Sequence, residues 1–339
     1  MADVEVKPGS RRRSRILTVV RYVALAIVIG FAVAFFADRW TQITEVIAQI
    51  PVPALLGSFA VLLVGMVANV LSWVTILNGL GHPVPLARGS QIMLVGQLGK
   101  YVPGSVWGYL MQMELGRQYG IARARVLVTT LYAAGVGVVA SLFLGASVIP
   151  TVVTDQPALA WLYVLLPIGL VCLHPRVMTW LSNLALKVFR RPPLEHRVRF
   201  GTVGAALGWS LLSYVLYGLH LHLLVGEVVP WSFITVIMLG GGLSLGFTAS
   251  LVAPILPSGA GIRELVMIVV LLAIGVPEIY ATASTLLSRA MFTAGDLLLA
   301  GAAVILVLIM RRTLRAQDAA TSEYAVPGET DAPAPAQAP

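Results

Sequence analysis

Charged residues and cysteines are both scarce in this chain. Of its 339 residues only 11% are charged, whereas a soluble domain usually has about 25%. Cys172 is the one cysteine, which excludes an intramolecular disulfide and any cluster of cysteine ligands for zinc or iron–sulfur. The sequence also lacks a Walker lysine loop, a His-Glu-x-x-His pair and an Asp-x-Asp nucleotide-sugar motif, so no cofactor or metal is expected.

Apolar residues dominate instead, and they indicate an integral membrane protein. They make up 58% of the chain, and the mean hydropathy is +0.87. Runs long enough to cross a bilayer fall at 16–37, 52–78, 125–149, 157–174, 201–225, 231–254 and 283–310, with a shorter run at 261–275. The predicted fold is therefore an all-α, polytopic membrane helical bundle.

Basic clusters predict the topology of this bundle. The net charge of +8 gathers between apolar runs, which speaks for membrane topology and anionic lipids rather than for nucleic acid. Eight crossings, with both termini cytoplasmic, place every Arg cluster on the cytoplasmic side if 91–115 is a re-entrant segment. This arrangement predicts a bacterial-type inner (plasma) membrane protein with a basic N-terminus (1–15), a transmembrane domain (16–312) and a disordered cytoplasmic tail (313–339). Segment 176–191 is either an interfacial helix or a solvated connector.

The most informative motifs are two interruptions of apolar stretches. The first contains Lys100 and the turn Pro103-Gly104-Ser105, and the second contains Pro257-Ser258-Gly259 followed by Gly261. Because an unpaired backbone group in hydrocarbon costs several kcal/mol, such breaks survive when they are buried or line a polar cavity. Two breaks in corresponding positions, followed by Gly120 and Gly275, indicate a two-fold internal repeat with a substrate site at the broken helices.

Charged residues near the second break predict an anion site. A helix that begins near Gly261 directs backbone N–H groups at one spot, where Arg263 adds donors suited to phosphate. The last span carries Thr282, Thr285, Arg289, Thr293 and Asp296 on one helical face. Charges at this depth must face the bundle interior or a wet cavity, so we weigh substrate contact against an ion pair between Arg289 and Glu264.

Lys100, Glu114 and Arg117 in the first half are the counterparts of the charged residues near the second break. Glu114 and Arg117 are spaced to pair on a helix surface. Ser210, Ser213, Tyr217 and His220 share one face of the 201–225 span and either line the same cavity or bond neighbouring helices. The glycines at 240–242 and Gly246 predict close helix packing.

These motifs resemble a known family. Leu256 to Glu264, then Gly275-Val276 and Leu286-Leu287-Ser288-Arg289, are similar to the second signature of the flippase-like family. That family is also known as the lysylphosphatidylglycerol synthase transmembrane-domain family. Gly99 to Trp107 resembles its first signature. Two positions depart from the pattern, because Ser258 replaces a usual Gly and Thr129 to Tyr132 replaces an acid–Arg pair.

The resemblance implies lipid handling without the fused synthase domain. We therefore expect a protein that binds and translocates a phosphate-bearing lipid or polyprenyl-linked substrate, with membrane lipids and an enzyme that makes the lipid as partners. Lys100, Arg263 and Arg289 would hold phosphate, while Glu264 and Asp296 would set charge and orientation. Two alternatives are a membrane-embedded transferase, with Glu264 or Asp296 as general base, and a non-catalytic membrane subunit.

Overall fold

The described part of the chain is entirely helical. The computed structural model describes residues 40–101, 107–148, 198–251 and 261–324, and isolated residues between 150 and 187. Residues 40–49 are helical, and the further elements are α2 (Val52–Gly79), α3 (Leu86–Gln97), the short 3-10 helix η1 (Leu98–Tyr101), α4 (Trp107–Gln118), α5 (Arg123–Gly145), α9 (Phe200–Val225), α10 (Phe233–Leu251), α11 (Ile262–Ala273) and α12 (Glu278–Tyr324). No strand occurs in these residues, so the predicted all-α membrane bundle is confirmed.

Five of the described helices are long and apolar enough to cross a membrane. They are α2, α5, α9, α10 and the Glu278–Met310 part of α12, and they match five predicted spans. The predicted span 16–37 lies outside the described residues, and the segments 157–174 and 176–191 contain only isolated described residues. Helix α11 corresponds to the short run 261–275, but its 12 residues extend about 18 Å, less than the roughly 30 Å of a hydrocarbon core.

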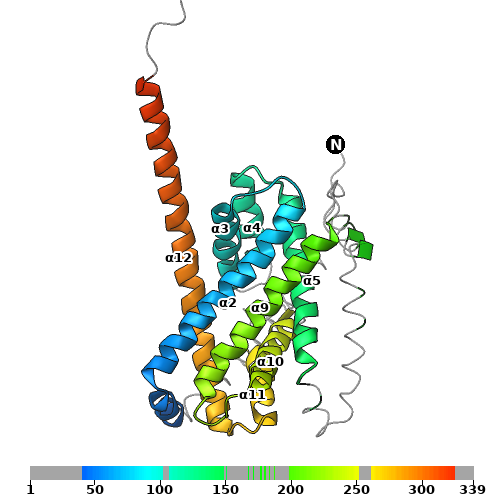
Figure 1. Cartoon of the computed structure of the whole chain (residues 1–339), viewed down its shortest axis with the longest axis vertical. Coiled ribbons are helices and arrows are strands. Elements are labelled where there is room, and N and C mark those ends of the chain that lie inside the picture. The colour runs from blue at the N-terminus through cyan, green and yellow to red at the C-terminus, as the bar shows by residue number, and fades with distance from the viewer. Residues whose placement is uncertain are drawn as a thin grey trace, which may run out of the picture.

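Helix α12 continues beyond the predicted transmembrane domain. It ends at Tyr324, so the first part of the predicted 313–339 tail is helical, and the residues after 324 lie outside the described part. Residues 313–324 contain three alanines and one each of Leu, Arg and Gln, and all of these residue types favour a helix. In Figure 1 this end of α12 projects well beyond the other helices.

The first interruption forms a helical hairpin. Helices α3 and α4 pack against each other, and the connections that precede α3 and follow α4 lie at the same end of the bundle (Figure 1). The segment 91–115 therefore enters the bundle and returns to the end from which it came, as the re-entrant prediction requires.

The second interruption forms a similar hairpin at the opposite end. Helix α10 begins and α11 ends near the lower end of Figure 1, where α12 starts. Small residues allow α10 to approach its neighbours closely. A Cβ at Gly240 would lie 2.3 Å from the backbone carbonyl oxygen of Tyr214, and a Cβ at Gly241 would lie 2.6 Å from that of Leu144. The predicted close packing of the glycine cluster is therefore confirmed.

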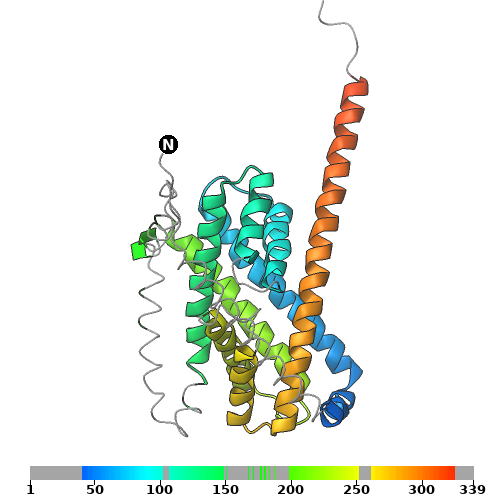
Figure 2. The same ribbon diagram turned by 180° about the vertical axis from the view of Figure 1, so that it is seen from behind.

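The two halves form an inverted repeat. Each consists of a long helix, a broken pair and a second long helix: α2, α3–α4 and α5 in the first half, α9, α10–α11 and α12 in the second (Figures 1 and 2). The contacts are reciprocal, because α3 packs on α12, α10 packs on α5, and α2 lies along α9. Both hairpins end in the same way. Gly120 and Gly275 have φ of 74° and 88°, and the residue after each donates to the carbonyl five positions earlier.

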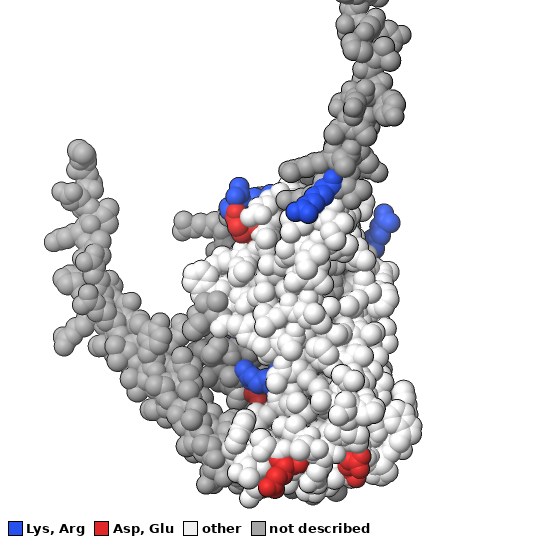
Figure 3. Space-filling model, turned by 90° about the vertical axis from the view of Figure 1, so that its left-hand side faces the viewer, with Lys and Arg blue, Asp and Glu red and all other residues white. Residues whose placement is uncertain are grey.

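Charge is distributed unevenly along the long axis. Figure 3 shows the basic side chains gathered mainly toward one end, with one acidic patch among them, and only acidic side chains at the other end. The wall between the two ends is nearly uncharged, apart from one spot where a basic and an acidic side chain lie together. The basic end holds the start of α5 and of α9, whereas Glu227 and Glu278 lie where α9 ends and α12 begins. An uncharged belt between two charged ends is the pattern of a membrane-spanning bundle.

Candidate functional site

A cavity of about 510 Å³ lies between the two halves. Residues from α2, α3, η1, α4 and α5 line it together with residues from α9, α10, α11 and α12. Its volume is within the roughly 300–1,000 Å³ of ligand pockets. The two hairpins and the long helices of both halves therefore contribute to one site.

The halves contribute equivalent positions to this cavity. Met93 and Phe247 both line it, as do Gln97 and Leu251, and the members of each pair are 154 residues apart. Tyr109 and Arg263 are a third such pair. The shared spacing indicates that the broken pairs α3–α4 and α10–α11 contribute residues in the same register, although most of the charge comes from the second half.

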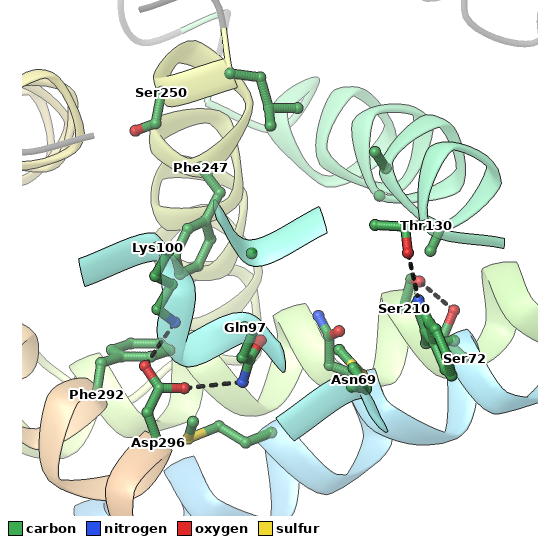
Figure 4. A pocket seen from close by; sticks show the side chains of 18 of the residues that line it. Asn69, Ser72, Gln97, Lys100, Thr130, Ser210, Phe247, Ser250, Phe292 and Asp296 are labelled. Carbon is green, nitrogen blue, oxygen red and sulfur yellow. Dashed lines mark hydrogen bonds and ion pairs between the residues drawn. The ribbon is translucent and has the colours of Figure 1, made fainter. Parts of the chain in front are cut away.

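Asp296 is the centre of the first charged group. It is 1% exposed on α12 and accepts hydrogen bonds from Tyr101 at 2.6 Å and from Gln97 at 3.0 Å. The Lys100 ammonium lies 2.5 Å from the same carboxylate (Figure 4). The first break thus delivers a lysine and a tyrosine to an acid of the second half, so the carboxylate is neutralised and hydrogen-bonded.

Glu264 and Arg289 form the second charged group. One carboxylate oxygen of Glu264 pairs with the Arg289 guanidinium, and the other accepts a hydrogen bond from the Gly261 backbone N–H at 2.6 Å. Gly261 has φ of 92°, which favours glycine, and precedes the first residue of α11. Glu264 therefore caps its own helix while it neutralises Arg289, and the proposed Arg289–Glu264 pair is present.

Arg263 differs from both groups. Its side chain lines the cavity and is held between the rings of Phe247 and Phe292, with its guanidinium carbon 4.6 and 4.5 Å from the two ring centroids. The residue is 9% exposed, and no carboxylate of the described residues pairs with it. Cation–π contacts on both sides position the guanidinium, but its positive charge is not compensated by a neighbouring acid.

The predicted site residues divide into three sets. Lys100, Arg263, Arg289 and Asp296 line the cavity, and Gly261 and Glu264 lie at the start of α11 beside it. The turn residues Pro103, Gly104, Ser105, Pro257, Ser258 and Gly259 lie outside the described residues. Of the threonines on the α12 stripe, Thr293 lines the cavity, whereas Thr282 and Thr285 are buried away from it.

Two of the predicted groups lie elsewhere. Glu114 forms ion pairs with Arg117 at 2.6 Å and with Arg123 at 2.5 Å on the surface, so the Glu114–Arg117 pair expected from their spacing is confirmed, but Glu114 does not line the cavity. His220 bonds Ser58 and Ser288 at 2.7 and 2.9 Å and thereby links α9 to α2 and α12. Ser210 and Tyr217, from the same predicted face, do line the cavity.

The sequence analysis missed the polar residues of α2, α4 and α5 that line the cavity. These residues are Asn69, Ser72, Gln112 and Thr130. Figure 4 shows Ser72 and Thr130 on the side away from Lys100 and Asn69 between the two sides. Single polar residues inside an apolar span are a weak signal, because they are usually bonded to a neighbouring helix. Convergence from three helices was not visible in any one span.

A family model described as "Lysylphosphatidylglycerol synthase TM region" matches residues 22–300. No curated protein matches the chain. The match covers both halves and all the cavity-lining residues named above.

Proposed function

The chain belongs to the family of the lysylphosphatidylglycerol synthase TM region, and from this premise we propose that it binds and translocates a phosphate-bearing lipid or a polyprenyl-linked lipid. The cavity between the halves is the proposed headgroup site. The two broken helices hold the polar part of the lipid there, and its acyl or prenyl chains remain in the bilayer.

The uncompensated charge of Arg263 carries the proposal. Three cations lie at the cavity, but Lys100 is paired with Asp296 and Arg289 with Glu264. Arg263 remains as an excess positive charge in a largely buried place. A buried charge is costly unless an opposite charge joins it, and a guanidinium offers the donor geometry that phosphate oxygens accept.

The charge asymmetry of the bundle supports a topology for this site. The positive-inside rule favours the basic end, with Arg117 and Arg123, as the cytoplasmic one. Both termini are then cytoplasmic in a bacterial-type inner membrane. The first hairpin then enters from the cytoplasmic side and the second from the opposite side, so the proposed site lies between one hairpin from each side of the membrane.

The geometry favours translocation over a membrane-embedded transferase. A general base must be free to take a proton from its substrate. The carboxylates considered for this role, Glu264 and Asp296, are each held by a cation and by further hydrogen bonds. We therefore propose that a partner enzyme makes the lipid, and that this chain moves it unchanged.

Reconstitution tests the proposal. Protein in liposomes with acyl-labelled fluorescent phospholipid should bring inner-leaflet lipid to the outer surface, where dithionite quenches the label. Arg263→Gln removes the excess charge and should lower the transfer rate at least about tenfold, because a hydrogen bond to a charged group contributes about 1.5–3 kcal/mol.

Arg117→Gln is the matched control, since it also removes one guanidinium but from the surface. Its transfer rate should equal that of the wild type. Transfer that is unaffected by Arg263→Gln, in protein that remains folded by gel filtration, would refute the assignment of this residue to the lipid phosphate.

A further inference from the structure

Uncharged hydrogen-bonding side chains form a second polar region in the cavity, which we call the amide–hydroxyl bank. It consists of Asn69 and Ser72 on α2, Gln112 on α4, Thr130 on α5 and Ser210 on α9. Figure 4 shows Ser72, Ser210 and Thr130 on one side of the view and the Asp296 group on the other, with Asn69 between them. The bank therefore lies beside the charged groups but separate from them.

The internal bonds of the bank leave hydrogen-bonding capacity for a ligand. The Ser72 hydroxyl donates its hydrogen to the Ala206 carbonyl at 2.8 Å, so Ser210 is the donor in the 2.9 Å hydrogen bond between the two serines. Each hydroxyl oxygen then keeps a lone pair that can accept a hydrogen bond from a ligand. The Thr130 hydroxyl accepts from the Trp73 indole N–H at 3.1 Å and donates to the Gln112 carbonyl oxygen at 2.6 Å.

Two amides complete the supply of donors. The Gln112 oxygen is occupied by Thr130, and its NH₂ group has no partner among the described residues. Asn69 lines the cavity without any hydrogen bond to a described residue, so its NH₂ group and its carbonyl oxygen are both available to hydrogen-bond a ligand. A region that offers uncharged donors and acceptors side by side suits hydroxyl groups, because each hydroxyl both donates and accepts.

The charges of the cavity disfavour a cationic headgroup. A carboxylate would favour an ammonium group, but Asp296 and Glu264, the acids of the two charged groups, are already paired with Lys100 and Arg289. Arg263 adds a positive charge that repels a second cation. A phosphate diester has a single negative charge, which matches the single excess guanidinium.

We propose that the amide–hydroxyl bank is a subsite for an uncharged, polyhydroxylated headgroup, such as glycerol or a sugar, joined to the lipid through a phosphate diester. This inference rests on the proposed function, in which Arg263 holds the phosphate. It adds that Asn69, Ser72, Gln112, Thr130 and Ser210 select the group beyond the phosphate.

A lipid panel tests the inference. Labelled phosphatidylglycerol and phosphatidylinositol carry polyhydroxylated headgroups, whereas phosphatidylethanolamine and phosphatidate with the same chains do not. Wild-type protein in liposomes should move the first two at least about fivefold faster than the others. Lysylphosphatidylglycerol, which adds positive charge to the glycerol headgroup, should move more slowly than phosphatidylglycerol.

Asn69→Leu is the decisive variant, because Asn69 has no hydrogen bond to a described residue that the substitution would break. It should lower the phosphatidylglycerol and phosphatidylinositol rates about three- to tenfold, as expected for one lost hydrogen bond, and leave the phosphatidate rate unchanged. Thr75→Val is the matched control on α2, since the Thr75 hydroxyl bonds the Leu71 carbonyl of its own helix and does not line the cavity.

The outcomes separate the two proposals. Equal rates for all headgroups, or faster movement of lysylphosphatidylglycerol, would overturn the subsite but not the proposed function, provided that Arg263→Gln still lowered the transfer rate. Unchanged transfer in Arg263→Gln would overturn the proposed function and the subsite with it. If no lipid moves, the melting temperature in detergent tests the subsite. A phosphatidylglycerol-induced rise in melting temperature that is present in the wild type and lost in Asn69→Leu would support the subsite. An equal effect of phosphatidylglycerol on both proteins would refute it.

Discussion

Neighbouring residues at the second break have different roles. Arg263 and Glu264 follow each other in the chain, and the sequence suggested that they act together. On a helix adjacent side chains diverge by about 100°, so Glu264 reaches Arg289 and the Gly261 N–H, whereas Arg263 lies between Phe247 and Phe292. The ion pair could be suggested from the sequence because a charge at membrane depth needs a partner or a wet cavity, although Glu264 and Arg289 lie on different helices. The aromatic contacts were not, because they depend on how α10 and α12 pack.

Separating the ion pair from the helix cap gives a residue-scale prediction. Glu264→Gln keeps an oxygen for the Gly261 N–H but removes the negative charge that pairs with Arg289. We expect a loss of about 2 kcal/mol in the free energy of unfolding, below the 3–5 kcal/mol for breaking a fully buried pair, because the Arg289 side chain is 30% exposed. Unfolding in detergent, followed by circular dichroism, measures this loss.

The double variant Glu264→Gln/Arg289→Gln provides the control. It removes both charges, so its loss should be smaller than the sum of the two single losses. Strict additivity would contradict an energetic coupling between Glu264 and Arg289.

Glu114 gives a prediction on pH dependence at the surface. Hydrogen bonds from Arg117 and then from Arg123 lower the pKa of Glu114 to about 2 from its ordinary 4.5. A lowered folded-state pKa means that the stabilisation is present above the unfolded pKa and is lost as the pH falls through the folded one. The difference in melting temperature between wild type and Glu114→Gln should therefore be constant from pH 7 to about 5 and shrink below about 4.5. A difference that grows on acidification would contradict the ion pairs.

At the scale of elements, the positions of the two helix breaks were predictable from the sequence. The helices against which the broken pairs pack were not. Proline and glycine fixed where the apolar runs stop, and the charge placement indicated that 91–115 turns back. The similar distances from Pro103 to Gly120 and from Pro257 to Gly275 indicated the repeat. The packing of α3 on α12, and of α10 on α5, joins elements far apart in sequence, and no local pattern encodes it.

The caps of the two hairpins should be energetically equivalent. An alanine at Gly120 or Gly275 would meet no atom within 4 Å, so its cost is the strain of a side chain at positive φ. We expect each substitution to lower the free energy of unfolding by about 1 kcal/mol. Gly201→Ala, at a position with open space within α9, should be neutral or slightly stabilising. A large loss at one hairpin end alone would contradict the equivalence of the two caps.

At the scale of the whole molecule, the inverted repeat has become functionally asymmetric. Tyr109 lies 154 residues before Arg263, and Ala134 and Gly137 lie 155 residues before Arg289 and Phe292, which is the spacing of Gly120 and Gly275. All three of these first-half residues line the cavity. The second half therefore provides the charge, while the first half provides Lys100 and part of the uncharged bank. The sequence located the charged half because buried charges are rare in spans. It missed the members of the bank other than Ser210, because they are ordinary polar residues until α2, α4, α5 and α9 bring them together.

The repeat also predicts which connections share a side of the membrane. Cysteines placed at His82 and Gln118, before and after the first hairpin, should react with a membrane-impermeant maleimide from the same side, in a Cys172→Ser background. Cysteines at Glu227 and Glu278 flank the second hairpin and should react from the opposite side. By the positive-inside rule the first pair should be labelled only after permeabilisation and the second pair in intact cells. If 82 and 118 reacted from opposite sides, α3 and α4 would cross the membrane rather than form a re-entrant hairpin. The two halves would then no longer be inverted copies around a shared cavity.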